Sequence, residues 1–459
     1  MLLTAIFLSL VAGSTRLEAE TAQLTDVRVA TQMAGFSGTG YVTDLTKDAS
    51  QLTWSAKLPK GIYDLVVGYS APNGEKGFDA VVDGFGLSGM LPRTAASANA
   101  SFARVTVGRV EVNKPTTQFV VKKGWGYYDL DYIELLPSAK SPRLVRPPAT
   151  LSDSNATPAA RRLFRRLVAA YGNGMFSGQY DAKENNHVQA KTGKMPAVFG
   201  NDFMDYSPSR VARGGIPRGE TERTIARAKA GQMVTYSWHW NAPKDLIDAE
   251  ITENGRTVDA RWYKGFYTNA TTFDVQKALA DPSGEDYKLL IRDIDVIAAE
   301  LKKLAKADVP VLWRPLHEAE GGWFWVGAKG PAPCKQLWLL MRDRLISHHK
   351  LHNLIWVWNS VRPEWYPGDD SVDIIGADLY PADRRDATAS TWDDLFSRFN
   401  GKKLLALTEY GQAPEVDRML RFGVRWSYFV SWTGPLGASA MKDEDLRRVY
   451  TSRKVFNVK

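Results

Sequence analysis

The feature that most constrains the fold is a regular alternation of short apolar segments and amphipathic patterns over residues 159–459. Short runs of apolar and β-branched residues are typical of buried parallel strands, and stretches such as 161–172 and 290–307 have the spacing of helices that cover such strands. We count eight candidate strands, at 175–181, 195–203, 232–240, 309–318, 353–359, 372–380, 404–411 and 426–434. Eight strands that alternate with helices predict a closed (β/α)8 barrel, a TIM barrel.

Two of these strands end in a carboxylate. The strand at 309–318 ends on His317-Glu318, and the strand at 404–411 carries Glu409 near its end, 91 residues later. Barrel active sites lie at the C-terminal ends of the strands, where a carboxylate serves chemistry better than stability. For Glu318 alone, capping of the next helix in contact with Arg314 is the competing interpretation. The second carboxylate favours the acid/base and nucleophile pair of a glycosidase.

The N-terminal part of the chain has a different pattern. Residues 17–137 contain short alternating runs separated by Gly, Pro and Asn, without a helical stretch, which predicts an all-β sandwich. Residues 138–158 are rich in Pro, Ser and Ala and lack periodicity, as in a semi-rigid linker. We therefore expect a multidomain protein with a sandwich, a linker and a barrel that begins at residue 159.

Composition and the first residues limit the classes of function. The net charge is +8, but Lys and Arg are scattered apart from 161–166, which argues against nucleic-acid binding. The one cysteine, Cys334, excludes an intrachain disulfide and a Cys-based metal site. Residues 1–16 have the apolar run and small residues of a secretory signal peptide, without its usual positive charge, and the run is too short to span a membrane. We expect a secreted, extracellular protein with no membrane partner, and with N-glycosylation sequons at Asn99, Asn155 and Asn269.

Specific motifs make the C-terminal region similar to family 26 of the glycoside hydrolases. They are WRPLHEAEGGWFWVG at 313–327 and LTEYG at 407–411, supported by SWHW at 237–240, GADLYP at 376–381 and SWTG at 431–434. The resemblance implies a retaining mechanism in which Glu318 is the acid/base and Glu409 is the nucleophile. Val326 departs from the pattern, because a further Trp is common there.

The same resemblance implies roles for residues around the two carboxylates. Tyr380 would position the nucleophile, and His239 and His317 would contact the nucleophile region or substrate hydroxyls, although buried core histidines are the alternative. Trp432 would form the floor of the −1 subsite, while Trp323 and Phe324 would line the cleft near +1. Packing explains the remaining candidates nearly as well: Asp378, Trp238, Trp240 and Arg314.

The N-terminal segment resembles the family 35 carbohydrate-binding modules, which are jelly rolls. The motifs are LEAE at 17–20, GFSGTGYV at 35–42 and GWGYYDLDYIEL at 124–135. The resemblance implies a structural Ca²⁺ held by Glu18, Glu20 and Asp131, whose hard oxygen atoms suit this ion. It also implies a sugar-stacking role for Trp125. The alternatives are acids that are merely exposed on strands, and a Trp that folds back onto the core.

Together these resemblances predict a monomeric, secreted endo-β-1,4-mannanase that needs no cofactor for catalysis. Its expected partners are β-mannan polysaccharides, including galactomannan and glucomannan, and manno-oligosaccharides. A xylanase or β-glucanase on the same scaffold is the alternative within the class, and a non-catalytic carbohydrate-binding protein is the alternative outside it. A metal-dependent barrel enzyme is disfavoured because no His-x-x-x-His or comparable cluster accompanies His239 and His317.

Overall fold

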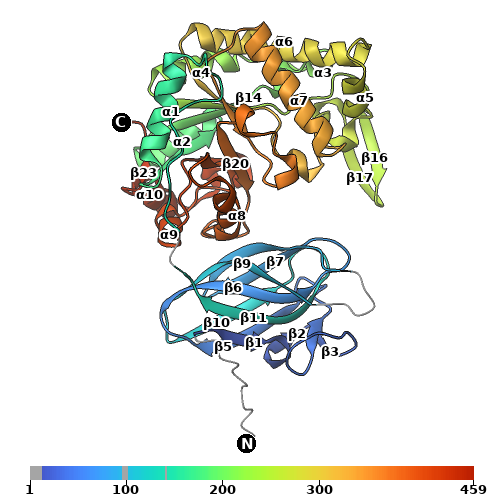
Figure 1. Ribbon diagram of the computed structural model, residues 1–459, viewed down its shortest axis with the longest axis vertical. Coiled ribbons are helices and arrows are strands. Elements are labelled where there is room, and N and C mark those ends of the chain that lie inside the picture. The colour runs from blue at the N-terminus through green and yellow to red at the C-terminus, as the bar shows by residue number, and fades with distance from the viewer. Residues whose placement is uncertain (1–12, 96–101, 140–141) are drawn as a thin grey trace, which may run out of the picture. The chain divides into compact units, whose positions relative to one another are not determined.

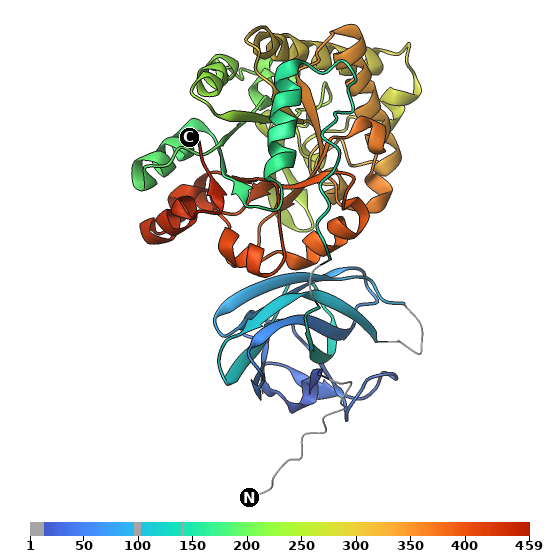
Figure 2. The same ribbon diagram turned by 60° about the vertical axis from the view of Figure 1, so that its left-hand side comes forward.

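The computed structural model describes residues 13–95, 102–139 and 142–459. These residues form two compact units, one built mainly from antiparallel strands and one in which strands and helices alternate (Figures 1 and 2). Most of the expected signal peptide and the sequon at Asn99 lie outside the described residues. Strand β1 (Thr15–Glu18) includes the last two residues, 15 and 16, of the segment expected to be the signal peptide. Within the described residues, no helix has the length and apolar character needed to cross a membrane.

The N-terminal unit contains two antiparallel sheets. The first has the order β3-β4-β11-β6-β9, and β1 also pairs with β11. Its further strands are β3 (Arg28–Ala30), β4 (Tyr41–Thr43), β6 (Gly61–Ser70), β9 (Ala103–Val112) and β11 (Asp129–Pro137). The second sheet has the order β2-β5-β10-β7-β8. Its strands are β2 (Gln23–Thr25), β5 (Gln51–Lys57), β7 (Lys76–Val82), β8 (Phe85–Leu91) and β10 (Thr116–Lys122).

The core of this unit lies between the inward faces of the two sheets. Alternation along the strands buries Leu65 and Val67 of β6, Phe78 of β7 and Val121 of β10 in one apolar cluster. The pairing of β1 with β11 joins the beginning of the unit to its end, with Leu17 opposite Ile133. The predicted β-sandwich is confirmed, and its N-terminal and C-terminal strands are neighbours.

In the second unit, parallel strands close into a barrel, as predicted. Among the described residues the barrel has eight strands: β13 (Gly178–Tyr180), β14 (Val198–Asp202), β15 (Met233–Ser237), β18 (Val311–Arg314), β19 (Leu354–Trp358), β20 (Ile374–Leu379), β21 (Leu404–Tyr410) and β22 (Phe429–Ser431). Each overlaps one predicted segment. The first segment is divided, since β12 (Met175–Phe176) pairs outside the barrel with β23 (Val455–Phe456). Every residue of β18, β19 and β21 is buried, which explains their continuous apolar character.

Helices surround the barrel strands (Figure 1). They are α1 (Pro158–Ala170), α2 (Ala182–Thr192), α3 (Pro208–Val211), α4 (Glu220–Lys229), α5 (Val275–Ala280), α6 (Glu285–Lys306), α7 (Pro331–Asp343), α8 (Ala389–Phe399), α9 (Val416–Arg421) and α10 (Asp443–Thr451). Local signals fix several of the ends. Thr157 caps α1 by accepting a hydrogen bond from Ala160 N, and α2 ends at Gly193, whose φ of 70° suits glycine.

The long interval between β15 and β18 contains a hairpin as well as α5 and α6. Strands β16 (Ala249–Glu253) and β17 (Arg256–Ala260) form this hairpin, which projects beside α5 in Figure 1. Before α1, the described residues 142–157 contain no helix or strand, but they are tied to the barrel unit. Val145 N donates to Asn400 Oδ1 at 2.8 Å, and Ser152 N donates to Asp373 Oδ1 at 2.6 Å. From about residue 144, the Pro-rich segment is therefore ordered against the barrel.

Candidate active site

The two predicted catalytic carboxylates reach the barrel mouth from β18 and β21. Glu409 lies within β21, where it is paired with Asp378 of the neighbouring strand β20. Glu318 lies four residues beyond the end of β18, in a left-handed conformation with φ 53°. Its N–H donates to Asn359, to the carbonyl oxygen at 3.0 Å and to Oδ1 at 3.1 Å. These bonds hold the strained backbone that turns Glu318 toward Glu409.

Glu318, Asp378 and Glu409 form a compact acidic cluster. Each contributes a carboxylate oxygen, and these oxygens lie within 4.8 Å of one another. The fully buried Arg314 neutralises part of this charge, because Nη1 contacts Asp378 Oδ2 at 2.6 Å and Nη2 contacts Glu409 Oε1. A trio of this kind could hold a metal ion, but the guanidinium already supplies the positive charge and uses oxygens of two of the three carboxylates.

Asp378 is fixed from three directions. Besides Arg314, its other oxygen accepts hydrogen bonds from Thr408 Oγ1 at 2.7 Å and Asn359 Nδ2 at 3.0 Å. Asn359 therefore contacts both the backbone of Glu318 and the side chain of Asp378. This network connects the ends of β18, β19, β20 and β21, so the relative position of the carboxylates does not depend on loop conformation alone.

The contacts of Arg314 distinguish the two glutamates chemically. Burial and the nearby Asp378 raise the pKa of Glu318 to about 7, and Arg314 opposes this shift only at a distance. Burial and Asp378 also raise the pKa of Glu409, but Arg314 opposes this shift and bonds directly to the Glu409 carboxylate. The cluster retains a proton at neutral pH, and we place it on Glu318, which lacks that bond. A protonated Glu318 beside an ionised Glu409 is the state that a general acid and a nucleophile require.

The two predicted histidines form a chain with an aspartate. His317 Nε2 lies 3.2 Å from His239 Nε2, and His239 Nδ1 lies 2.6 Å from Asp202 Oδ2. Burial lowers the pKa of His239, but Asp202 more than compensates and raises it. Burial, Arg314 and His239 lower the pKa of His317 well below its usual range. These opposite shifts favour His239 as the donor and His317 as the acceptor.

The aromatic residues predicted for the cleft are placed differently from one another. Trp323 is 48% exposed, and its Nε1 donates to Glu318 Oε2 at 2.9 Å. Phe324 is buried against His239 and His317, with ring centroids 5.4 and 5.1 Å away. It therefore supports the histidines and offers little surface to a substrate. Trp432 follows β22 and packs edge-on against Tyr180 at 4.8 Å.

Tyr380 directly follows β20 and is 38% exposed, at the same end of the barrel as Glu409. Trp240, expected in the cleft, is instead 2% exposed. It stacks on Trp238 at 4.1 Å and donates from Nε1 to Asp293 of α6 at 2.8 Å. A stacking platform needs at least one ring face open to the ligand, so this buried indole is part of the packing between barrel and helix. The substrate-binding role predicted for Trp240 is therefore corrected to a packing role.

Several residues of this network were not identified from the sequence, namely Asn359, Tyr180, Asp202 and Thr408. The Tyr180 hydroxyl oxygen accepts a hydrogen bond from Arg314 Nη2 at 2.8 Å. Each lies at or near the C-terminal end of a predicted barrel strand. Polar residues at these strand ends were thus the available signal, but these four lie outside the motifs' assigned roles.

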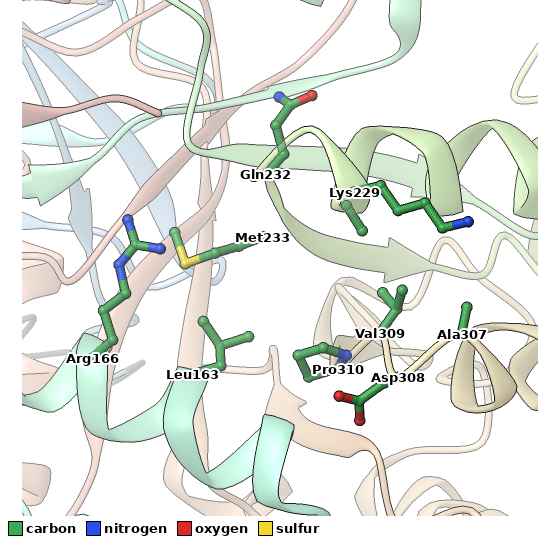
Figure 3. Close-up of a pocket in the computed structure, with 11 residues that line it drawn as sticks. Leu163, Arg166, Lys229, Gln232, Met233, Ala307, Asp308, Val309 and Pro310 are labelled. Carbon is green, nitrogen blue, oxygen red and sulfur yellow. The ribbon is translucent and has the colours of Figure 1, made fainter. Parts of the chain in front are cut away.

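A pocket of about 290 Å³ lies elsewhere in the barrel unit (Figure 3). Its lining includes Met233, the first residue of β15, and Val309 and Pro310, which precede β18. Figure 3 shows these residues facing the side chains of Leu163 and Arg166 from α1. The pocket is at the N-terminal ends of the strands, where barrel residues usually serve stability. It is therefore separate from the acidic cluster.

In the N-terminal unit, Glu18, Glu20 and Asp131 gather around the loop at 37–39. Ser37 Oγ donates to Glu18 Oε2 at 2.6 Å, and Ser37 N donates to Asp131 Oδ1 at 2.9 Å. Burial, opposed by Ser37 and supported by the neighbouring acids, raises the pKa of Asp131 to about 6. Glu20 Oε2 is buried without a hydrogen-bond partner among the described residues. Three hard oxygen donors with an unsatisfied atom fit a Ca²⁺ ion.

The expected stacking residue Trp125 is exposed on the loop between β10 and β11. It is 57% exposed, and the nearby Tyr127 is 68% exposed. The loop is close-packed on β7 below, because a Cβ on Gly77 would lie 2.2 Å from the Trp125 ring. The indole therefore does not fold into the core, which was the alternative to a role in ligand binding.

A parallel eight-stranded barrel with two carboxyl groups this close at the C-terminal ends of its strands defines a glycoside hydrolase. Residues 152–458 match the model of glycosyl hydrolase family 26, and residues 15–138 match carbohydrate binding module family 35. The chain belongs to family 26 and carries a family 35 module, as the motifs predicted.

Known mannanases match the chain over almost its whole length. The chain is 40% identical to a mannan endo-1,4-β-mannosidase of Thermothelomyces thermophilus, over 97% of this chain and 90% of the relative. It is 32% identical to mannan endo-1,4-β-mannosidase B of Piromyces, over 96% of this chain and 76% of the relative. The crystal structure of a β-(1,4)-mannanase with the same two domains, from Podospora anserina, has a TM-score of 0.68 and 40% identity, covering 97% of this chain and 98% of that one.

Proposed function

We propose that this protein is a retaining endo-β-1,4-mannanase that hydrolyses internal bonds of mannan, galactomannan and glucomannan. The observation that carries the mechanism is the distance between carboxylate oxygens of Glu318 and Glu409, which is no more than 4.8 Å. Retaining glycosidases have their carboxyl groups about 5–5.5 Å apart, whereas inverting enzymes need about 6.5–9.5 Å to admit water. The mannanase relatives support the choice of substrate.

The reaction proceeds in two displacements. In the first, Glu409 attacks the anomeric carbon while the bond to the leaving sugar breaks, and the proton of Glu318 passes to the leaving oxygen. In the second, Glu318 takes a proton from water, whose oxygen bonds to the anomeric carbon and displaces Glu409 from the glycosyl ester. Both residues return to their starting state, so the cycle needs no cofactor.

Surrounding residues assist both steps. Arg314 keeps Glu409 ionised before attack and stabilises it again as a leaving group. Trp323 donates to Glu318 Oε2, so the indole fixes the acid/base in place. The half-buried Trp432 can offer its indole to the −1 sugar, and the exposed Tyr380 lies where it can contact the nucleophile region. His239 contacts His317 and packs near Trp432, with ring centroids 6.0 Å apart.

The N-terminal module would bind the insoluble substrate. We propose that Trp125 stacks on mannan and that Glu18, Glu20 and Asp131 hold a structural Ca²⁺ that joins the first and last strands. We also propose that the protein is secreted, monomeric and glycosylated. Asn155 is exposed before α1, whereas Asn269 is half-buried and donates to Glu253 at 2.9 Å, so Asn155 is the more accessible of the two described sequons.

The test is hydrolysis of mannan, galactomannan, glucomannan, xylan and mixed-linkage β-glucan by the wild type and by Glu409→Gln. The matched control is Glu320→Gln, which alters a nearby carboxylate that accepts hydrogen bonds from Val361 N and Arg362 N. We expect activity on the mannans, with a loss of at least about four orders of magnitude for Glu409→Gln only, equivalent to about 6 kcal/mol.

The anomer formed first, followed by proton NMR, tests retention. Release of the β-anomer supports the double displacement, and release of the α-anomer would refute it. Preference for xylan or β-glucan would overturn the substrate but leave the carboxylate pair in place. A fully active Glu409→Gln variant would show that the nucleophile is another residue.

A further inference from the structure

We propose that Asp202 is a positioning residue for the hydrolytic reaction, because it holds His239 as an imidazolium. This imidazolium donates a hydrogen bond to His317. It also provides Glu409 with a second nearby cation, besides Arg314. The inference rests on the proposed function for its kinetic part only. Asp202 ends β14 and does not belong to the acidic cluster, so it acts through His239.

Asp202 is held as a carboxylate by several donors. Ser237 Oγ donates to Oδ2 at 2.6 Å, and Met204 N and His239 N donate to Oδ1 at 2.6 and 3.1 Å. Burial alone raises the pKa of Asp202, but these bonds and His239 overcome this effect and lower it to about 2. A carboxylate that ionises this readily fixes the His239 Nδ1 proton, at 2.6 Å.

The proton on the other nitrogen follows from the geometry. His239 Nε2 and His317 Nε2 are 3.2 Å apart, so one nitrogen must donate and the other must accept. Asp202 raises the pKa of His239, whereas burial, Arg314 and His239 lower that of His317. His239 therefore donates from both nitrogens as imidazolium, and neutral His317 accepts at Nε2 and retains its proton on Nδ1.

The charge on His239 reaches the nucleophile. Charged and titratable groups face His239 from each neighbouring element: Asp202 on β14, Arg314 on β18, His317 after β18 and Glu409 on β21. Its other neighbours are the uncharged rings of Phe266, Phe324 and Trp432. His239 lowers the pKa of Glu409, whereas it is not among the groups that shift Glu318. Loss of Asp202 should thus raise the pKa of Glu409 and leave the pKa of Glu318 unchanged.

The test compares Asp202→Asn with Asp153→Asn. Asp153 forms the same kind of pair, with Oδ2 2.8 Å from His352 Nδ1, but it lies before α1, and His352 precedes β19. Nitrogen-15 NMR titration of the six histidines needs no substrate. We expect His239 to be an imidazolium at pH 7 in the wild type and in Asp153→Asn, and neutral in Asp202→Asn.

The kinetic readout is the pH profile of kcat/KM on a soluble manno-oligosaccharide. With the imidazolium gone, the pKa of Glu409 rises, so the acid limb should move upward by at least about half a pH unit while the basic limb stays. Asp202→Glu should restore the acid limb. Neutral His239 in the wild type, or a fall in kcat with both limbs unmoved, would overturn the proposal. An inactive wild type with a charged His239 would refute the proposed function instead.

Discussion

Asp378→Asn should shift the pH range of activity to lower pH. The Asp378 carboxylate raises the pKa of Glu318, second only to burial, and their oxygens lie within 4.8 Å. Glu318 must be protonated to act as the acid, so kcat/KM falls as the pH rises through its pKa of about 7. Removal of the neighbouring charge lowers that pKa, and the basic limb should move to lower pH.

The size of the shift follows from the distance. Two unit charges 4.8 Å apart interact by about 0.9 kcal/mol in water and by about 3.5 kcal/mol at an effective dielectric constant of 20. One pKa unit corresponds to about 1.36 kcal/mol, so the basic limb should move by about 0.6 to 2.5 pH units. The acid limb should move in the same direction, because Asp378 also raises the pKa of Glu409.

The assay is initial-rate hydrolysis of soluble galactomannan from pH 4 to 9. The matched control is Asp373→Asn, which removes a buried carboxylate just before β20, at the opposite end of the same strand, where it accepts from Trp356 N at 2.7 Å. Asp373→Asn should lower stability without moving either limb. A basic limb that stays in place, or moves to higher pH, in Asp378→Asn would refute the charge coupling.

Three further predictions concern stability and binding. Arg314→Met leaves two buried carboxylates without their cation, so urea denaturation should show a loss of about 3–5 kcal/mol, and an unchanged midpoint would contradict the ion-pair reading. Chelation with EGTA should lower the melting temperature of the wild type, and Ca²⁺ at 100 times its Kd should restore about 2.7 kcal/mol. Glu20→Gln should abolish the stabilisation by Ca²⁺. A variant stabilised as much as the wild type would exclude a Ca²⁺ site at Glu20. Trp125→Ala should lose retention on insoluble mannan but keep the wild-type rate on short oligosaccharides, and equal retention would show that another surface binds.

The sequence predicted the barrel because its strands are buried on both sides. The segment at 353–359 contains five consecutive apolar residues that become β19, and no other environment in a soluble protein suits such a run as well. Glu318 and Glu409 were selected as candidate catalytic residues because a carboxylate is unusual at the end of such an apolar strand. The sequon at Asn155 and the acidic residues of the module were also recognised from short stretches of the sequence.

The remaining features depend on contacts between distant residues. Trp240 belongs to the same SWHW motif as His239, yet strand geometry turns it toward Asp293, which is 53 positions away. Asn359 looks like an ordinary polar residue after a strand, and its importance appears only when β18 and β20 are adjacent to β19. The bonds from Asp202 to His239 likewise require the β14–β15 register. The hydrophobic periodicity of the sequence does not reveal these contacts between distant residues.

The crowding of Glu318, Asp378 and Glu409 around one guanidinium makes catalysis and thermostability competing demands in this enzyme. A carboxyl with a folded pKa of about 7 and an ordinary pKa of 4.5 when unfolded favours the unfolded chain increasingly as the pH rises between these values. Above neutrality the penalty approaches about 3.4 kcal/mol. Glu318→Gln should therefore melt at a higher temperature than the wild type at pH 8 and by a much smaller margin at pH 5. Selection for stability in alkaline conditions, without selection for turnover, would remove the general acid first.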